Sequence, residues 1–246
     1  MSWLKSLFFN KDLQPISFSV LGCDIHSHLI AGIDDGSPDV ETSVSIIKNM
    51  IKLGYKKAIT TPHIMSDFYR NNPTNIMQGL ELVRQELKNQ SIDFTIEAGA
   101  EYFLDFEFAE KLETEKLLSW GDNYLLVETS FISAPPRFHE TIFQIQLKQY
   151  KMVLAHPERY LYMTIDELKE LKLKNVFLQL NLLSLVGYYG KEVEKRAKTL
   201  IDLEMVDFVG TDCHNLQQSV LLQECQTNKY WHKLVAQNNF SIQSAL

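Results

Sequence analysis

The stretch Asp24-Ile25-His26-Ser27-His28 stands directly after an apolar run of the chain. That run predicts a β-strand over Ser17–Asp24. Side chains at alternate positions of a strand share a face, so Asp24, His26 and His28 are expected to point to one side. Histidine is among the commonest metal ligands, and two imidazoles at one strand end make half of a metal site. The other half has to come from elsewhere in the chain.

Apolar, strand-like runs alternate with helix-like stretches along the chain. The predicted strands are Ser17–Asp24, Lys57–Thr61, Thr95–Ala100, Tyr124–Thr129, Met152–His156, Val176–Leu180 and Phe208–Thr211. The predicted helices are Val40–Lys52, Thr74–Leu87, Phe106–Leu118, Glu140–Tyr150, Ile165–Lys172, Lys191–Leu203 and Ser219–Ala236. This alternation indicates a parallel sheet with right-handed crossovers. No Gly-, Pro- or Ser-rich linker divides the chain, so we expect one domain over residues 17–246 after an apolar N-terminal segment, residues 1–16.

Residues with metal-binding side chains close six of the seven predicted strands. They are His26 with His28, His63, Glu101, Glu128, His156, and Asp212 with His214. An open sheet gathers its functional groups near one switch point, whereas a barrel takes them from the C-terminal ends of many strands. We therefore predict an α/β fold, a single-domain seven-unit β/α barrel related to the eight-unit form. Its metal centre is expected at the C-terminal ends of the strands.

These eight residues supply only nitrogen and oxygen donors. Such a set suits Mn²⁺, Zn²⁺ or Fe and fits Ca²⁺ poorly. Eight ligands exceed the needs of one ion, so two or three divalent ions are expected, as is usual for phosphoester hydrolysis. Asp24 is a further candidate, either as a ligand or as a group that orients an imidazole. Glu97 comes earlier in its strand and is expected to be structural.

Two other residues are candidates for catalysis. Asp35, in the loop Asp34-Asp35-Gly36, could act as a general acid near the histidines. An acidic pair in a loop could equally be solvated or cap the next helix. Arg159 follows His156 by three residues and could fork onto a phosphate, although a surface arginine is the plainer interpretation.

Composition excludes some classes of protein. The net charge of −7 and a pI of about 5.5 argue against a general binder of nucleic acid or anionic membranes. The three cysteines show no framework spacing, which is typical of buried thiols in a reducing compartment. None is followed six positions later by arginine, as a cysteine-based phosphatase would require. The N-terminus is short for a secretory signal and no apolar run approaches the roughly 20 residues of a transmembrane helix, so we expect a cytoplasmic protein.

The motifs as an ordered set resemble a known family. They are Asp24-Ile25-His26-Ser27-His28, Thr61-Pro62-His63, Gly99-Ala100-Glu101, Glu128, Ala155-His156-Pro157-Glu158-Arg159 and Asp212-Cys213-His214-Asn215. In this order they resemble the polymerase-and-histidinol-phosphatase (PHP) superfamily. The closer similarity is to the bacterial manganese-dependent protein-tyrosine phosphatases of capsule and exopolysaccharide operons, through the Asp34-Asp35-Gly36 loop and the Ala155–Arg159 block.

The resemblance implies a distorted seven-unit barrel with two or three metal ions, most often manganese. It implies metal ligation by the eight residues above, and a phosphate site lined by Asp35 and by Arg159 as a clamp. The implied substrate is phosphotyrosine on the tail of a membrane tyrosine kinase that controls polysaccharide export. No nucleic-acid partner is expected, and the implied place of action is close to the membrane. The chain departs from the branch by lacking basic residues in Ile64-Met65-Ser66 and Leu216-Gln217-Gln218. Arg70 and Arg137 are candidate substitutes.

Other interpretations stay open at this point. The same centre could hydrolyse histidinol phosphate or another small phosphomonoester, or the protein could be a metal-binding scaffold of an export complex. Five aromatic residues near the expected mouth could pack on an aromatic substrate or simply form core: Phe68, Tyr69, Tyr102, Phe103 and Tyr160. The apolar N-terminal segment could pack on the domain or contact a membrane or partner.

Overall fold

The computed structural model describes residues 13–237 and 240–246. Most of the apolar segment expected at the N-terminus, residues 1–12, lies outside this part. The strands are β1 (Cys23–Asp24), β2 (Lys57–Thr60), β3 (His63–Ile64), β4 (Thr95–Ala98), β5 (Glu101–Phe103), β6 (Tyr124–Glu128), β7 (Lys151–Ala155), β8 (Phe177–Asn181) and β9 (Phe208–Gly210). Neighbouring strands pair in parallel in the orders β1-β2-β4 and β3-β5-β6-β7-β8-β9, which confirms the predicted parallel architecture.

The two sheets are halves of one bent sheet. Thr61-Pro62 separates β2 from β3, and Gly99-Ala100 separates β4 from β5. Hydrogen bonding continues through both bends, since Gly99 N donates to Thr60 O at 2.9 Å and Glu101 N donates to Pro62 O at 3.1 Å. Proline has no N–H to give to the ladder, so a break at Pro62 is expected. Seven strand units result, as the sequence predicts.

The last unit meets the first beyond the ends of their strands. Ser27 and Cys213 form an isolated parallel bridge, and His28 N donates to Cys213 O at 3.0 Å. Asp212 N likewise donates to His26 O at 2.8 Å. These contacts bring the first motif beside the last at the C-terminal ends of the strands, in the manner of a distorted seven-unit barrel.

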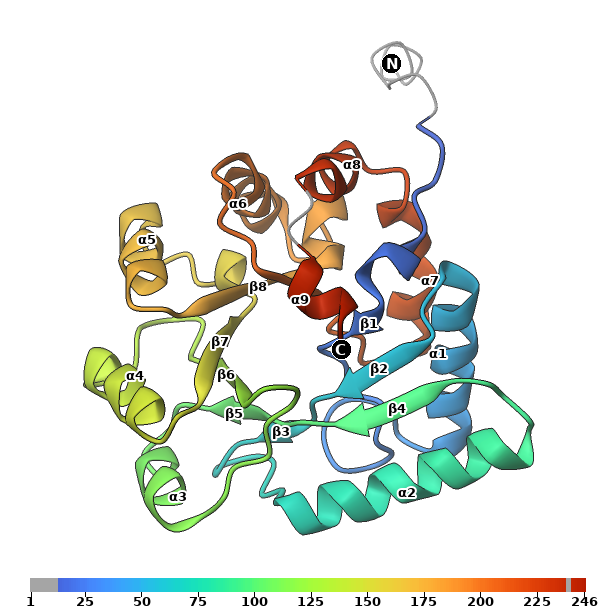
Figure 1. Ribbon diagram of the computed structural model, residues 1–246, viewed down its shortest axis with the longest axis horizontal. Helices are drawn as coiled ribbons and strands as arrows, with labels where there is room; N and C mark the ends of the chain where they lie inside the picture. Colours follow the sequence, from blue (N-terminus) through green and yellow to red (C-terminus); the bar gives the residue numbers. More distant parts are fainter. Residues whose placement is uncertain (1–12, 238–239) are drawn as a thin grey trace.

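Helices lie around the outside of the strands, except for the last one, which lies over one end of them (Figure 1). They are α1 (Val40–Leu53), α2 (Pro73–Asn89), α3 (Phe108–Thr114), α4 (Phe138–Leu147), α5 (Ile165–Leu173), α6 (Lys191–Asp202), α7 (Leu216–Cys225), α8 (Lys229–Ala236) and α9 (Ser241–Ser244). The start of α1 follows its cap signal, since Asp39 Oδ1 accepts a hydrogen bond from Thr42 N at 2.7 Å. None of the helices in the described residues is long and apolar enough to cross a membrane.

Three predicted elements are wrong in part. The segment Phe18–Leu21 is a 3₁₀ helix instead of strand, because Ser17 caps it and Phe18 and Leu21 are buried at a spacing of one helical turn. The predicted helix Ser219–Ala236 is two helices, because Asn228 caps a new start by accepting from Tyr230 N at 2.8 Å. The predicted helix Phe106–Leu118 is shorter, and the chain turns extended at Glu115.

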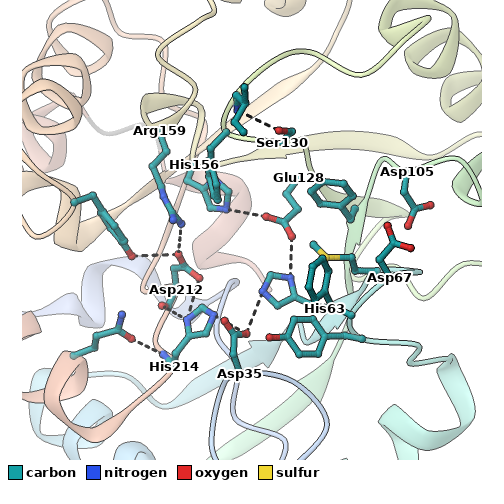
Figure 2. Close-up of a pocket in the computed structure, with 18 of the residues that line it drawn as sticks. Asp35, His63, Asp67, Asp105, Glu128, Ser130, His156, Arg159, Asp212 and His214 are labelled. Atoms are coloured by element: carbon teal, nitrogen blue, oxygen red, sulfur yellow. Dashed lines mark hydrogen bonds and ion pairs between the residues drawn. The ribbon is translucent and has the colours of Figure 1, made fainter.

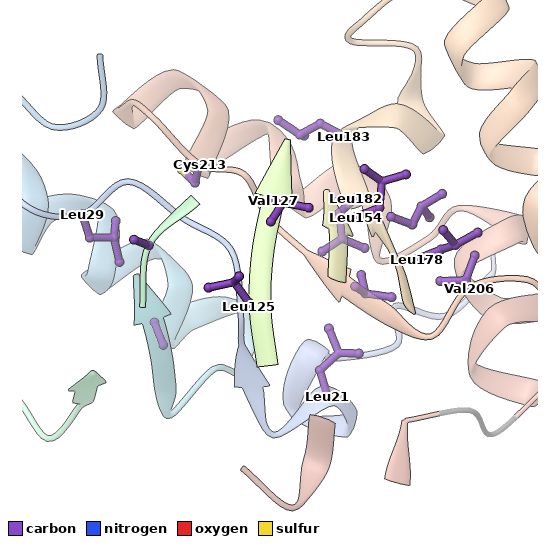
Figure 3. Packing of buried hydrophobic residues seen from close by; sticks show 14 of the residues in the cluster. Leu21, Leu29, Leu125, Val127, Leu154, Leu178, Leu182, Leu183, Val206 and Cys213 are labelled. Carbon is purple, nitrogen blue, oxygen red and sulfur yellow. The ribbon is translucent and has the colours of Figure 1, made fainter. Parts of the chain in front are cut away.

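Strand β6 is buried on both faces, so it divides the core into two layers. Leu125 and Val127 belong to the large cluster beneath the helices, which Figure 3 shows together with Leu154 and Leu178. Leu126 belongs to a smaller cluster with residues of the other strands. Because Leu126 shares strand parity with Glu128, this smaller cluster lies on the face that carries the site and supports it from below.

At the other end of the barrel, α9 joins β1 to β9 through one side chain. Gln243 is fully buried, and its Nε2 donates to Cys23 O at 2.8 Å and to Val209 O at 2.7 Å. Its Oε1 accepts from Val209 N at 2.9 Å. The amide thus takes the place of ladder hydrogen bonds between the two strands.

Replacing Gln243 with alanine is expected to lower the free energy of unfolding by about 2–3 kcal/mol, because buried backbone groups lose their partners. Denaturant unfolding followed by circular dichroism measures the loss. The control is Gln78→Ala on the exposed face of α2, expected to change stability by less than about 0.5 kcal/mol. Equal effects of the two variants would show that α9 does not brace the barrel.

Candidate metal centre

The structure brings the eight predicted ligands to one end of the barrel, and Figure 2 shows His63, Glu128, His156, Asp212 and His214 among them. The loop after β1 supplies His26 and His28, and the segment after β9 supplies Asp212 and His214. The remaining four come from β3, β5, β6 and the residue after β7: His63, Glu101, Glu128 and His156. Seven of the eight are buried, and His214 is partly exposed.

Glu101 lies at the centre of the cluster. Its Oε2 is 3.2 Å from His26 Nε2, 3.4 Å from His28 Nε2 and 3.2 Å from His63 Nδ1. Its Oε1 is 3.1 Å from His156 Nε2. One carboxylate therefore faces four imidazoles, an arrangement suited to a ligand that bridges ions.

The donor atoms fall into three overlapping groups, each small enough to surround one ion. The groups are His26, His28, Glu101 and Asp212; His63, Glu101 and Glu128; and His28, Asp35, His63 and His214. His156 Nε2 adjoins the second group, 3.8 Å from Glu128 Oε2. A neutral imidazole has one free lone pair, so His63 can serve one of its two groups. Asp35 is the member that the sequence pattern did not mark as a ligand.

The residues present fit divalent ions. Buried His63 Nδ1 and Glu128 Oε1 are only 3.0 Å apart, yet neither makes a hydrogen bond. His28 Nε2 is also buried without a hydrogen bond. Donors bound about 2.1 Å from one ion lie about 3.0–3.4 Å from each other without pointing at each other. Atoms aimed at a shared point rather than at one another are what a metal site requires.

Ionisation of the cluster agrees with this interpretation. Burial opposes charge on Glu101, but His26 and His63 outweigh it and hold the pKa of this carboxyl well below its usual range. Burial disfavours the charged form of His26, but Glu101 and Asp212 raise its pKa to about 9. Ions must therefore displace protons from the imidazoles, which makes metal binding tighter as pH rises.

Asp34 is a residue whose role the sequence left open. His28 Nδ1 donates to Asp34 Oδ2 at 2.8 Å, which leaves His28 Nε2 facing the centre. Burial raises the pKa of Asp34, but His28 outweighs this and lowers it to about 2. Gly36 lets the loop approach closely, because a Cβ there would lie 2.4 Å from the Cβ of His28.

Gln179 and Asn181 of β8 were not predicted at all. His26 Nδ1 donates to Gln179 Oε1 at 2.8 Å, and Gln179 Nε2 donates to Asn181 Oδ1 at 2.9 Å. Asn181 Nδ2 in turn donates to Asp212 Oδ2 at 2.6 Å. β8 carries no predicted ligand, but its polar side chains thus orient two predicted ligands, His26 and Asp212. Its signal is the alternation of polar Gln179 and Asn181 with leucines inside a buried strand.

Asp24 takes neither of its expected roles. Its Oδ1 accepts from Thr211 N and its Oδ2 from Thr211 Oγ1, both at 2.9 Å. Among the described residues, the groups that could hold an ion do not include it. Asp24 instead anchors the segment after β9, which carries Asp212 and His214.

Replacing Gln179 with leucine is expected to weaken metal affinity about 10- to 100-fold, because His26 loses the acceptor that fixes its orientation. Chelator competition followed by metal analysis measures the affinity. Gln78→Leu on the exposed face of α2 is the control and should bind metal as the wild type does. Unchanged metal affinity in the Gln179 variant would show that Gln179 does not help to position His26 for metal binding.

Arg159 and Asp35 both line a cavity of about 680 Å³ in front of the cluster. Arg159 Nη1 is 3.3 Å from Asp212 Oδ2, and its guanidinium lies 4.2 Å from the ring centroid of Phe131 and 4.4 Å from that of Tyr189. These contacts hold the fork at the edge of the site. Asp35 is half-exposed, and its Oδ1 is 3.5 Å from both His63 Nε2 and His214 Nε2.

The structure shows which of the other predicted contact residues line the cavity and which do not. Phe68, Tyr69 and Phe103 line the cavity, as do the unpredicted Phe131, Ile132 and Tyr189. Tyr102 and Tyr160 are buried core residues. Arg70 and Arg137 do not line the cavity: Arg70 Nε donates to Ser66 O at 2.7 Å, and Arg137 Nε donates to Glu140 Oε2 at 2.6 Å. Among the residues that the structure describes, Arg159 is therefore the arginine that lines the cavity.

Comparison with known proteins gives consistent matches. The sequence model of the family "Capsular polysaccharide synthesis, CpsB/CapC" matches residues 22–240. Tyrosine-protein phosphatase YwqE of Bacillus subtilis is 29% identical over 197 residues, 79% of this chain and 78% of YwqE. Tyrosine-protein phosphatase CpsB of Streptococcus pneumoniae is 27% identical over 201 residues, 78% of this chain and 83% of CpsB.

Solved structures match as well. A chain from the crystal structures of YwqE and CpsB, described as unique metal-dependent tyrosine phosphatases, superposes with a TM-score of 0.75 at 26% identity, over 91% of this chain and 90% of that one. A histidinol phosphate phosphatase from Lactococcus lactis has a TM-score of 0.51 at 13% identity, over 85% of this chain and 93% of that one. The second likeness is one of fold alone.

Proposed function

The chain belongs to the CpsB/CapC family of capsular polysaccharide synthesis, and from this membership we propose that it is a metal-dependent phosphatase that hydrolyses phosphotyrosine on protein. The observation that carries the proposal is the cluster of ligands around Glu101, which has Arg159 at its edge and an aromatic-lined cavity in front. The names of the relatives YwqE and CpsB, both tyrosine-protein phosphatases, support it.

The three groups of donor atoms support three ions, and manganese is our proposal for their identity. His26, His28, Glu101 and Asp212 would hold one ion, and the remaining donors would hold two more, with His63 bound to one of these two. When bound, such ions lower the pKa of a water molecule and neutralise charge on the phosphate. The domain would extend over residues 17–246.

The chain's own residues complete the chemistry. Arg159 presents two parallel N–H donors that match two phosphate oxygens, so it binds the phosphate and stabilises charge that grows on it. Tyr69 and Phe131 offer ring faces on which the phenyl group of phosphotyrosine can pack. Phenolate is a good leaving group, so its protonation contributes little to the rate.

Asp35 has two possible roles in this site. Its geometry, 3.5 Å from two imidazoles, suits an oxygen ligand. Its pKa lies below the usual value, chiefly through its contact with His214, so it is ionised at neutral pH. We therefore favour Asp35 as an ion-holding residue at the phosphate site over Asp35 as the general acid.

We propose as the physiological substrate the tail of a membrane-associated tyrosine kinase that controls capsular or exopolysaccharide synthesis. The family description and the capsule-linked relatives support this assignment. A cytoplasmic enzyme working close to the membrane would meet such a tail.

The test is turnover by metal-stripped protein with Mn²⁺ added back, on a tyrosine-phosphorylated peptide and on histidinol phosphate. Hydrolysis of the peptide that depends on Mn²⁺ is the expected result. Preference for histidinol phosphate would keep the chemistry and overturn the substrate assignment. Metal binding without turnover of either compound would favour a scaffold role.

A further inference from the structure

A second cavity, of about 570 Å³, lies between α3 and α4 beside the mouth of the metal centre. Asp105 lines both this groove and the cavity in front of the ions. The segment 130–136 also runs along both, since Ser130, Phe131 and Ile132 line the first cavity and Pro135 and Pro136 line the second. The groove is therefore an extension of the candidate active site.

The wall shared by the two cavities is fixed in place. Asp105 Oδ1 accepts hydrogen bonds from Glu107 N at 3.0 Å and Phe108 N at 3.1 Å, at the start of α3. Its Oδ2 accepts from Ser66 N at 2.8 Å, on the loop after β3. Binding in the groove therefore requires little ordering of this wall, which preserves affinity.

Apolar side chains are exposed along this extension. Phe106 is 76% exposed at the groove, and Ile132 is 86% exposed at the mouth of the first cavity. Leu104, Phe108 and Leu112 form its floor. Exposed apolar side chains that continue from a catalytic cavity mark a surface that another molecule covers.

The charged side chains around the two cavities favour some ligands over others. Asp67 lies with Asp105 on the side of the cavity opposite Arg159 (Figure 2). In the described part of the chain, Arg137 is the cation that lines the groove, and it is already paired with Glu140. The far side of the site from the phosphate is therefore acidic or apolar, which disfavours an acidic ligand there.

We propose that this groove binds the polypeptide that flanks the phosphotyrosine, and that it prefers apolar, non-acidic residues. The inference rests on the proposed function. A tyrosine side chain that reaches the metal centre leaves its own backbone at the mouth, so its neighbours must lie on the adjoining surface. The groove is the part of the adjoining surface that offers apolar area to these flanking residues.

The test uses the full-length, manganese-loaded protein and three substrates. Two are tyrosine-phosphorylated peptides that differ only in their flanking residues, leucine and phenylalanine in one and glutamate in the other. The third is p-nitrophenyl phosphate, which is too small to reach the groove. The wild type should show a lower KM for the apolar peptide.

Phe106→Ser is expected to raise the KM for the apolar peptide about tenfold, which corresponds to about 1.4 kcal/mol, and to leave p-nitrophenyl phosphate hydrolysis unchanged. Phe143→Ser is the matched control, because Phe143 is 57% exposed on α4 but does not line the groove. This variant should behave as the wild type on all three substrates.

Equal KM values for the two peptides, or no effect of Phe106→Ser, would overturn the proposed role of the groove in peptide binding. Either result would leave the phosphatase assignment unchanged. Sedimentation could instead show that Phe106→Ser loses self-association without a change in KM. That result would mean that the groove binds a second copy of the chain, and it would also overturn the proposal of peptide binding. Failure of the wild type to hydrolyse any of the three substrates would overturn the proposed function, and this inference with it.

Discussion

Replacing Glu101 with alanine is expected to lower kcat/KM at least about a thousandfold, because metal ions contribute several kcal/mol of transition-state stabilisation. Its two oxygens face four imidazoles at 3.1–3.4 Å, and it belongs to two of the three donor groups. Removing it should therefore cost the protein most of its bound manganese. Phosphopeptide turnover and metal analysis of the purified protein measure the two effects.

Glu97 provides the matched control, because it lies in the same bent strand four residues earlier. Its side chain is 47% exposed and pairs with Lys57 at 2.7 Å, and it belongs to none of the donor groups found among the described residues. Glu97→Ala should keep both metal content and turnover. A Glu101→Ala protein with full metal content and near wild-type turnover would refute the central role of this carboxylate. Circular dichroism of both variants separates loss of metal from loss of fold.

The clustering of the eight candidate ligands could be predicted because the fold places these residues by a simple rule. Parallel strands that alternate with helices direct their C-terminal ends to one side, so polar residues that end apolar runs must meet there. His63 and Glu101 illustrate this: each begins the second half of a bent strand, and the structure pairs them in register. The bends themselves leave the rule intact, because pairing continues across them.

Residues that act through other side chains could not be recognised in the same way. Gln179 lies in a strand, where a polar residue usually faces water, and only the tertiary structure turns it toward His26. Asp34 and Asp35 are adjacent, and the loop conformation decides which one contacts His28. Phe18–Leu21 has strand-like composition, but a serine cap decides its conformation. The groove beside α3 depends on how two helices pack, which local sequence does not encode.

Replacing Arg159 with alanine is expected to lower kcat/KM for p-nitrophenyl phosphate about 100- to 1,000-fold, the usual cost of removing one preorganised donor to a developing charge. Metal content should stay at the wild-type level, because Arg159 contacts Asp212 Oδ2 but belongs to no donor group. Arg159→Lys keeps the positive charge but loses the forked pair of donors. Its activity should therefore lie between that of the wild type and that of Arg159→Ala.

The same assay distinguishes Arg159 from the other arginines proposed for the phosphate. Arg70→Ala and Arg137→Ala should leave turnover of the small substrate unchanged, since neither side chain lines the cavity. Strong loss in one of these controls would mean that its loop closes over the substrate and that Arg159 is not the only clamp. Loss of metal in Arg159→Ala would instead assign Arg159 to holding Asp212 in place. Retained metal with lost turnover is the result that makes Arg159 a group that binds the phosphate itself.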